Sequence, residues 1–324
     1  MSFTLPDPDL QILFSQRVVA ARKQFMQPAL LEAVRKCSIE DLDRDAHKYV
    51  PVPALQQIAG HGFRAEIVFA LPTLLRHNPR LLAYYRLFLG YSQKLFYGSG
   101  TGLSGFKSLE EGASLTEEQN DAIPDVCAVL NQAVALLVWG IRDDITIQHV
   151  SDLSLLTYGP QLRGGRNVLI GQEAIRQVFE SVQSLIGGHA TKVTKRYINF
   201  TDSTGRSMQV VFSSDPDIAV FSVSARPPHI KAPVLAIEVK GGADYSNAGN
   251  RLGEAEKSHV KAKARGFTDL WTIVNVVGLS EERRRAESPT TTAFFDLMDV
   301  IAREGNAYED FRERFLQKLR LPGA

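Results

Sequence analysis

The chain has 324 residues, of which 44% are hydrophobic and 23% charged, a composition typical of a globular protein with one large or two modest domains. Its formal net charge of +1 argues against a protein that coats nucleic acid through a global basic excess. The two cysteines, Cys37 and Cys127, fit no zinc motif and no disulfide framework, which favours a reducing cytoplasm.

No segment of the sequence is expected to enter a membrane. Residues 1–9 carry neither the basic nor the apolar stretch of a signal peptide, so we expect none. The most apolar run, Ala128–Ile141, includes Asn131 and Gln132 and is too short to span a bilayer. We therefore predict a cytoplasmic protein without a membrane partner.

Apolar residues at helical spacing dominate the first part of the chain and predict a mainly helical region over residues 1–145, followed by a second region over residues 146–324. Leu10–Lys36 is one amphipathic pattern that Gln27-Pro28 is expected to interrupt. Ala122–Gly140 has an apolar face suited to a core or a dimer interface. Two further helices are predicted, over Pro51–Ala59 and Arg80–Tyr97.

A predicted strand at Leu153–Tyr158 is followed by a glycine-rich loop at Gly159–Asn167, which presents Arg163, Arg166 and Asn167 on an exposed backbone. Arginine and asparagine make bidentate contacts with guanine and adenine edges in the major groove of DNA, each worth about 1–3 kcal/mol of discrimination. The loop is therefore a candidate for DNA contact, and an ordinary basic surface turn is the alternative.

Between this loop and the acidic motifs lie a predicted helix, a basic cluster and a hairpin. The helix spans Gln172–Ile186, and the cluster includes Lys195 and Arg196, whose charges suit phosphate groups. The turn signal at Asp202–Gly205 predicts that its two flanking runs pair as a hairpin. These runs are Arg196–Phe200 and Ser207–Phe212.

Two β-rich runs, Ile218–Val223 and Val234–Val239, are joined by a proline-containing loop and are expected to pair as an antiparallel hairpin. The start of the first run then lies beside the end of the second, so Asp217 would lie beside Glu238. Glu238 and Lys240 are two residues apart and project from the same face of the strand. The sequence thus predicts a small acidic cup with an ammonium group at its rim.

Two carboxylates in such a cup suit Mg²⁺, which binds oxygen ligands and keeps several waters. This metal activates a water and neutralises charge on a phosphodiester, while Lys240 can orient the nucleophile and stabilise the developing negative charge. The alternative is an ordinary charge pair, because Glu-x-Lys is common on exposed strand faces and Pro-Asp is common in turns.

The hairpin is followed by a predicted helix, Leu252–Arg265, on which Lys257, Lys261 and Arg265 share one face. This basic edge either faces solvent or lies along DNA. The helix is expected to cross over to a parallel core strand at Trp271–Val277.

The absence of Gly-x-Ser-x-Gly and His-Glu-x-x-His argues against serine-hydrolase and zinc-protease chemistry. Two closing helices are predicted, over Thr291–Ala302 and Tyr308–Lys318.

Pro216-Asp217 followed by Glu238-Val239-Lys240 resembles the signature of the PD-(D/E)XK nuclease superfamily. The resemblance implies an α/β (α+β) fold, with a mixed β-sheet nuclease core flanked by helices and a largely helical N-terminal region. It also implies that Asp217 and Glu238 are metal ligands and that Lys240 is the catalytic lysine. Many members supply a further acid from an upstream helix, which makes Glu66 a candidate. The alternative for Glu66 is a pair with the nearby Arg64.

Longer motifs resemble type II restriction endonucleases of the XcyI type. They are Leu89–Tyr97, Gly159–Asn167, Ser214–Ile218, Ile237–Gly242 and Asn247–His259. This resemblance implies a prokaryotic homodimer that uses Mg²⁺ to cleave double-stranded DNA at a short, GC-rich palindrome, and a DNA methyltransferase in the same system. We expect Asn250, Arg251 and Lys257 to contact DNA as well. A non-catalytic DNA-binding protein and a structure-specific repair nuclease of the same fold are the alternatives.

Overall fold

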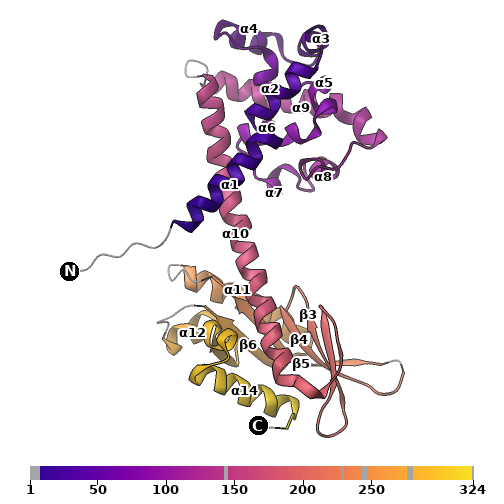
Figure 1. The fold of residues 1–324 in the computed structure, drawn as a ribbon, viewed down its shortest axis with the longest axis vertical. Coiled ribbons are helices and arrows are strands. Elements are labelled where there is room, and N and C mark those ends of the chain that lie inside the picture. Colours follow the sequence, from indigo (N-terminus) through magenta and orange to yellow (C-terminus); the bar gives the residue numbers. More distant parts are fainter. Residues whose placement is uncertain (1–7, 142–144, 228, 243–246, 276–279, 323–324) are drawn as a thin grey trace, which may run out of the picture. The chain divides into compact units, whose positions relative to one another are not determined.

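The computed structural model describes residues 8–141, 145–227, 229–242, 247–275 and 280–322, and the chain divides into two compact units, Met1–Gly164 and Gly165–Ala324 (Figure 1). The division falls inside one long helix, α10 (Ile147–Ile186), whereas the sequence placed it after residue 145. The last two residues of the predicted parallel strand, Val276 and Val277, lie outside the described residues.

The described residues of unit 1 form helices and no strand, as predicted for the N-terminal region. Leu10–Lys36 forms two helices, α1 (Asp9–Gln24) and α2 (Gln27–Lys36). Pro28 stands in the first turn of α2, where its missing N–H group removes no helical hydrogen bond. The helices that follow are α3 (Ile39–Tyr49), α4 (Val52–Gly60), α5 (Pro72–His77), α6 (Leu82–Phe88), α7 (Gln93–Phe96), α8 (Lys107–Glu110) and α9 (Glu117–Ile141).

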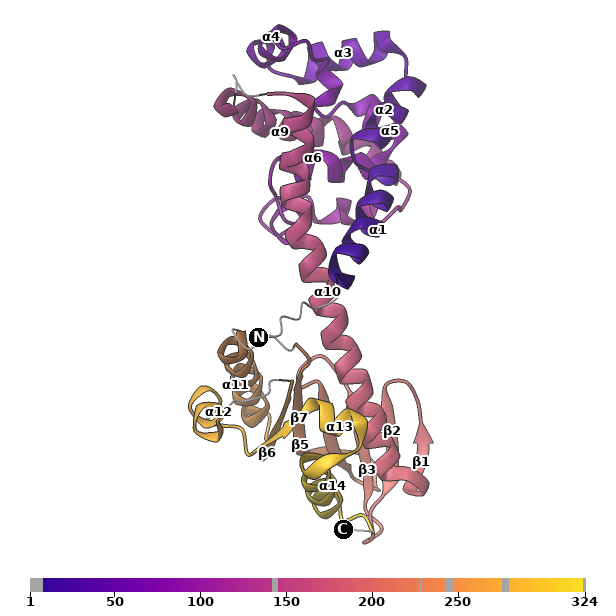
Figure 2. The same cartoon turned by 60° about the vertical axis from the view of Figure 1, so that its left-hand side comes forward.

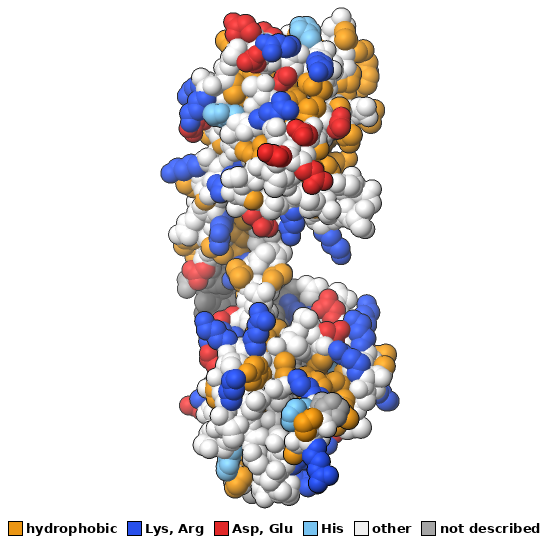
Figure 3. Space-filling model, turned by 90° about the vertical axis from the view of Figure 1, so that its right-hand side faces the viewer, with side chains coloured by type: hydrophobic (Ala, Val, Ile, Leu, Met, Phe, Trp, Pro, Cys, Tyr) orange, Lys and Arg blue, Asp and Glu red, His pale blue; other side chains and the backbone are white. Residues whose placement is uncertain are grey.

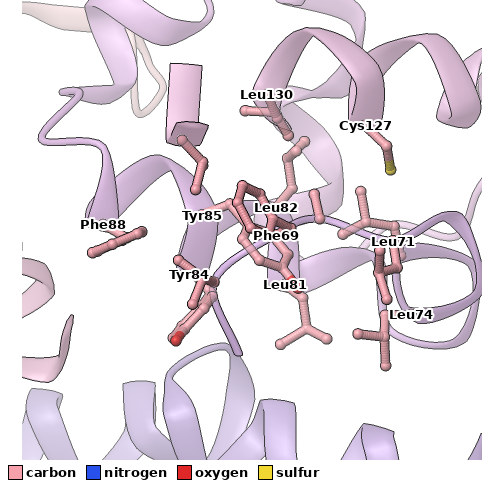
Figure 4. Packing of buried hydrophobic residues seen from close by; sticks show 14 of the residues in the cluster. Phe69, Leu71, Leu74, Leu81, Leu82, Tyr84, Tyr85, Phe88, Cys127 and Leu130 are labelled. Carbon is pink, nitrogen blue, oxygen red and sulfur yellow. The ribbon is translucent and has the colours of Figure 1, made fainter. Parts of the chain in front are cut away.

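Buried apolar side chains from α2 to α9 meet in one core (Figure 4). Phe69 and the α6 residues Tyr84 and Tyr85 lie at its centre, with Leu130 and Cys127 contributed by α9. The hydroxyl group of Tyr84 donates to the Ile67 carbonyl at 2.7 Å, so the buried ring keeps a hydrogen-bond partner. The core therefore joins segments that lie far apart in the sequence.

Helix α9 is long and apolar enough, by length and composition, to cross a membrane. Its buried face nevertheless carries Asn131, whose amide oxygen accepts from the Ala70 N–H group at 2.8 Å. The Asn131 amide nitrogen donates to the carbonyls of Tyr49 at 3.0 Å and Ala70 at 2.9 Å. A buried amide bonded to neighbouring segments is typical of a helix in the core of a globular protein.

The prediction of one helix over Arg80–Tyr97 is wrong, because α6 and α7 are separate helices. Gly90 lies between them with φ of 78°, a left-handed conformation that glycine adopts without steric cost. The Ser92 side chain then accepts from the Leu95 N–H group and caps α7. A glycine stop and a serine cap therefore outweigh the apolar spacing that runs through both helices.

The predicted strand at Leu153–Tyr158 and the predicted loop at Gly159–Asn167 are also wrong, because both segments belong to α10. The glycines and Pro160 suggested a loop, but the helix continues through them, and buried residues at helical spacing lie on both sides of this segment. The predicted helix Gln172–Ile186 is confirmed as the last part of α10. Buried residues spaced by multiples of four are Val150, Ser154, Tyr158, Ala174, Val178, Val182 and Ile186.

Unit 2 is built on a seven-stranded sheet in which the strands follow one another in chain order (Figures 1 and 2). Neighbours from β1 to β5 are antiparallel, and β5, β6 and β7 run parallel. The predicted mixed sheet, both hairpins and the parallel strand after the crossover helix are confirmed. The strands are β1 (Ala190–Val193), β2 (Tyr197–Thr201), β3 (Ser207–Phe212), β4 (Ile218–Val223), β5 (Lys231–Lys240), β6 (Asp269–Val274) and β7 (Ala293–Asp296).

The two faces of this sheet are covered by different helices. The second half of α10, α13 (Leu297–Ala302) and α14 (Gly305–Leu319) pack on the face that carries the larger core (Figure 2). On the other face, α11 (Ala248–Ala264) packs over β5 and β6, where Ala262 meets Ala236 and Leu270. The short helix α12 (Glu281–Glu287) follows β6. Glu238 alternates with the larger-core residues of β5 and so belongs to the α11 face.

The closing segment Thr291–Ala302 is not a single helix as predicted, because β7 precedes α13. Ala293 and Phe295 alternate into the larger core, which is the pattern of a strand. The Asp296 side chain then accepts from the N–H groups of Met298 and Asp299 and begins α13. The predicted helix Tyr308–Lys318 is confirmed within α14.

Candidate active site

The β4–β5 hairpin brings together the two acids that the sequence placed in one cup. Ile218 pairs with Ile237, so Asp217, which precedes β4, lies beside Glu238. The Val239 N–H group donates to Asp217 Oδ2 at 2.8 Å and fixes that carboxyl group against the end of β5. The antiparallel pairing predicted from the two β-rich runs is thus present.

The loop before Asp217 is tied to α11 by ion pairs. Asp215 accepts from Lys261 Nζ at 3.2 Å and lies 3.4 Å from Arg265 Nη2. The Ser213 N–H group donates to the Asp217 carbonyl at 3.0 Å and closes the loop. Lys261 and Arg265, considered for a DNA-facing edge, are therefore engaged by an acid of the same chain.

The charges in the cup are buried and only partly balanced. Glu238 is 2% exposed; its Oε2 accepts from Lys240 Nζ at 3.0 Å, whereas its Oε1 is buried without a hydrogen-bond partner. Burial, followed by the nearby charge of Glu238, raises the pKa of Asp217 to about 7. Burial lowers the pKa of Lys240, but the charges of Glu238 and Asp217 outweigh it and the net shift is upward. Lys240 therefore stays protonated at neutral pH.

This arrangement fits a hard divalent cation. Two buried carboxyl groups repel one another unless a proton or a cation lies between them, and the raised pKa of Asp217 expresses its burial first and this repulsion second. The unpartnered Oε1 of Glu238 is an oxygen ligand of the kind that such cations prefer. Among the described residues, no three His, Cys, Asp or Glu side chains gather into a metal-binding group.

A cavity of about 550 Å³ adjoins the cup, and its wall includes Asp217 and Lys240. Its other walls come from the part of α10 in unit 2 and from the first turns of α11. A Cβ atom on Gly241 would lie 2.7 Å from the Cβ atom of Ala174, so α10 can approach the end of β5 only because residue 241 has no side chain. The cavity thus has walls on elements that the sequence separates widely.

Residues 15–322 match the model of the XcyI restriction endonuclease family. The chain belongs to this family. It is 42% identical over 320 residues to the type II restriction enzyme XcyI of Xanthomonas campestris pv. cyanopsidis, covering 98% of this chain and 96% of that enzyme. It is 40% identical over 314 residues to the type II restriction enzyme Cfr9I of Citrobacter freundii, covering 96% of this chain and 94% of that enzyme.

As a member of the XcyI family, the protein is a type II restriction endonuclease, an enzyme that hydrolyses phosphodiester bonds in DNA at specific sites. This excludes the non-catalytic DNA-binding protein and the repair nuclease that the sequence left as alternatives. Type II restriction enzymes generally use a divalent metal ion, in agreement with the oxygen-rich cup of unit 2.

Sequence analysis missed Glu254 as a candidate for this site. Glu254 lies on α11, lines the same cavity as Lys240, and its charge contributes to the raised pKa of Lys240. The signal that could have found it is topological, because the first turns of a helix that follows a strand lie near the carboxyl end of that strand, where ligands bind.

Glu66 lies in unit 1, in a short 3₁₀ turn at Ala65–Ile67, whereas Asp217 lies in unit 2. Its side chain is 2% exposed and accepts from Arg64 Nε. Arg64 also pairs with Asp43 at 3.0 Å. The pair with Arg64 is the alternative that the sequence offered, and a catalytic role for Glu66 remains a hypothesis.

The residues predicted to contact DNA fall into two groups. Lys195 and Arg196 lie in the turn between β1 and β2, and the Phe212 N–H group donates to the Arg196 carbonyl at 2.7 Å. Because Phe212 pairs with Ile218, this turn lies at the end of the sheet that carries Asp217. The other predicted contacts are Asn167, Asn250 and Arg251, which line the cavity, exposed Lys257 on α11, and Arg163 and Arg166 on α10.

Arg163 belongs to unit 1 and Arg166 to unit 2, and both lie on a helix where the sequence predicted an exposed loop. On the face of unit 1 that Figure 3 shows, acidic and basic side chains are interspersed, in keeping with the net charge of +1. Local groups of cations such as Lys195 and Arg196, rather than a global excess, are the candidates for phosphate contact.

Proposed function

We propose that Asp217 and Glu238 bind Mg²⁺ and that Lys240 assists hydrolysis of double-stranded DNA at a short, GC-rich palindrome. The observation that carries this proposal is the unbalanced charge of the cup. Asp217 has a pKa of about 7, and one oxygen of Glu238 is buried without a partner. Mg²⁺ suits this set because it prefers oxygen ligands and keeps several waters.

The bound metal would supply an activated water and positive charge at the phosphodiester. Asp217 loses its remaining proton, while the Val239 N–H group holds the carboxylate in place. Protonated Lys240 donates to Glu238 and can stabilise negative charge that develops on the phosphate. Glu254, which lines the same cavity, is a candidate further acid for this machinery.

A homodimer follows from the chemistry of the substrate. One set of Asp217, Glu238 and Lys240 acts on one strand, so two antiparallel strands need two sets related by a two-fold axis. On α9, Val129, Leu136 and Trp139 are 62%, 74% and 56% exposed, which suits a surface where subunits associate.

The host must also be protected from such an enzyme. A DNA methyltransferase in the same prokaryotic system would modify the same site without any physical contact with the nuclease. Reduced cysteines, one of them buried in the core of unit 1, agree with a cytoplasmic location where both proteins reach DNA.

The proposal is tested by Asp217→Ala, with Asp215→Asn as the matched control in the same loop. Asp217→Ala is expected to abolish Mg²⁺-dependent cutting of plasmid DNA while leaving DNA binding largely intact. Asp215→Asn removes only the contacts with Lys261 and Arg265 and should retain cutting. Wild-type cutting by the Asp217 variant would refute the assignment, and sequencing the ends of cut DNA would give the recognition site.

A further inference from the structure

Three amide side chains line the cavity beside the proposed cleavage site. Asn167 and Gln172 come from α10, and Asn250 comes from the first turn of α11. All three are exposed, and among the described residues none of them has a side-chain hydrogen-bond partner. Their donors and acceptors are therefore available to a ligand.

The two cations of the same cavity, Lys240 and Arg251, are occupied, in contrast to these amides. Lys240 donates to Glu238 at 3.0 Å, and Arg251 donates to the Gly242 carbonyl. Asp217 accepts from the Val239 N–H group at 2.8 Å. The uncommitted hydrogen-bonding groups of Asn167, Gln172 and Asn250 are neutral, whereas a site built to hold a phosphate would offer free cations.

The chemistry of an amide matches the edge of a base. Each amide has one oxygen that accepts and one NH₂ group that donates. In the major groove, guanine presents two acceptors, cytosine one NH₂ donor, and adenine an acceptor beside a donor. Side chains that combine both roles at one tip can therefore distinguish base pairs, which a bare cation cannot.

The position of these amides relative to the cleavage site is fixed by close packing. The Cβ position of Gly241 lies 2.7 Å from Ala174 Cβ and 3.1 Å from the Ile170 carbonyl, so α10 sits directly on the end of β5. Along α10, Asn167 precedes this contact, and Gln172 lies between Ile170 and Ala174, the two residues that make it. Recognition groups on a rigid helix are held more precisely than groups on a loop.

We propose that Gln172, together with Asn167 and Asn250, reads the base pair next to the cleaved phosphodiester bond. The inference rests on the proposed function, because it takes that bond to lie at Asp217 and Lys240. Lys195 and Arg196, by contrast, contact the backbone without reading sequence. Gln172 was not among the residues that the sequence assigned to DNA.

The test measures kcat/KM for Gln172→Ala, Gln172→Met and Asn250→Ala on the cognate site and on sites that each differ by one base pair. Each variant should lose roughly tenfold to a hundredfold on the cognate site, and discrimination should fall at a single base-pair position. Gln172→Met keeps the length of the side chain and separates lost hydrogen bonds from lost packing. Gln177→Ala, on the same helix but bonded to Glu173, is the matched control and should behave as wild type.

The salt dependence of DNA binding decides between base and phosphate contact. Loss of a base contact should leave the slope of log Kd against log salt unchanged. Loss of a phosphate contact should reduce this slope and weaken binding to all sequences alike. Uniform weakening, or wild-type discrimination at every position, would overturn the proposal. If Asp217→Ala still cut DNA, the proposed function would be contradicted instead. The specificity of that variant could then still be measured, so the two proposals can fail separately.

Discussion

Each unit of the enzyme buries a charged cluster, but only the cluster in unit 1 satisfies its own polar atoms. Arg86 is 1% exposed and donates to both oxygens of Glu110, at 2.6 and 3.0 Å, and to the Tyr91 carbonyl at 2.6 Å. Glu110 also accepts from Gln93 at 2.8 Å and Tyr97 at 2.7 Å. In unit 2, by contrast, Glu238 Oε1 has no partner.

The difference in hydrogen bonding distinguishes a charged cluster that stabilises the fold from one that has room for a ligand. A buried ion pair whose hydrogen bonds are complete gains nothing from an added ion, whereas an incomplete one does. It also gives a structural role to residues of two segments that resemble the XcyI family. Leu89–Tyr97 supplies three partners of the Arg86–Glu110 pair, and Gln161 of Gly159–Asn167 accepts from Arg86 at 3.1 Å.

The largest effect is expected from Glu238→Gln, which removes a proposed metal ligand and leaves the shape of the side chain. Cleavage should fall on the order of a thousandfold or more. The free energy of unfolding without metal should stay the same or rise, because the repulsion between residues 217 and 238 is lost while the new amide oxygen can still accept from Lys240. Steady-state cleavage and urea unfolding of the purified variant check both halves. If the Glu238→Gln variant is less stable than wild type and still cuts, then the Glu238 cluster holds the fold, as the Arg86–Glu110 pair does, and does not serve cleavage.

Arg86→Ala should have the opposite signature. Removing one partner of the buried pair leaves Glu110 charged and buried, which costs about 3–5 kcal/mol of stability. Cleavage per folded molecule, measured at a temperature where the variant is folded, should remain within a few-fold of wild type. A loss of stability below about 1 kcal/mol would show that the Arg86–Glu110 pair does not hold the fold of unit 1.

The stability of the metal-free enzyme should fall as pH rises from about 4 to about 7 because of Asp217. In this range the folded state keeps the Asp217 proton, whose pKa is raised to about 7, and the unfolded state has released it. The fall is on the order of 2–4 kcal/mol and ends above pH 7.

Asp217→Asn should remove this contribution, which urea unfolding in a metal chelator between pH 4 and 8 will show. Burial lowers the pKa of His259 to about 4 and gives a slope of the opposite sign, since its stability contribution is lost as pH falls from about 6.5. That slope is common to wild type and variant, so only their difference is interpreted. Identical pH profiles would contradict the raised pKa of Asp217.

A smaller effect is expected from Gly241→Ala, with Gly253→Ala as control. The added methyl group at residue 241 collides with Ala174 and should cost about 1–3 kcal/mol of stability and reduce cleavage. Gly253 lies in α11 with nothing within 4 Å of its Cβ position, so alanine there should stabilise by about 0.5–1 kcal/mol. Thermal unfolding of both variants checks this prediction. Equal stability of the two variants would show that the contact between α10 and β5 does not depend on the missing side chain of Gly241.

The sequence predicted the parts of unit 2 that depend on local pattern. Period-two runs with a turn signal between them gave the hairpins, and the hairpin alone placed Asp217 beside Glu238. The prediction failed in α10, where Gly159 and Pro160 suggested a loop although the helix continues through them. Buried side chains at helical spacing lie on both sides of this stretch, up to Tyr158 and again from Ala174, so the packed ends of the helix outweigh the local turn signals.

The wall of the cavity could not be predicted in the same way. Gln172 shares a cavity with Lys240 only because α10 approaches the end of β5, and that approach depends on the missing side chain of Gly241. Glu254 reaches the same cavity from α11. A glycine after a strand is common, so the sequence alone does not show which helix occupies the space above it. A sequence motif was enough to predict the two acids, whereas the groups around them are known only from the packing in the structure.

The most direct test of a shared divalent ion is calorimetric titration of the DNA-free enzyme with Mg²⁺ or Mn²⁺ at pH 7, repeated in buffers of different ionisation enthalpy. We expect wild type to bind one ion per subunit and to release part of a proton, which comes from Asp217 at its raised pKa. Asp217→Asn and Glu238→Gln should each weaken binding, and the Asp217 variant should release no proton. Equal affinity and equal proton release in wild type and both variants would contradict a cation held between residues 217 and 238.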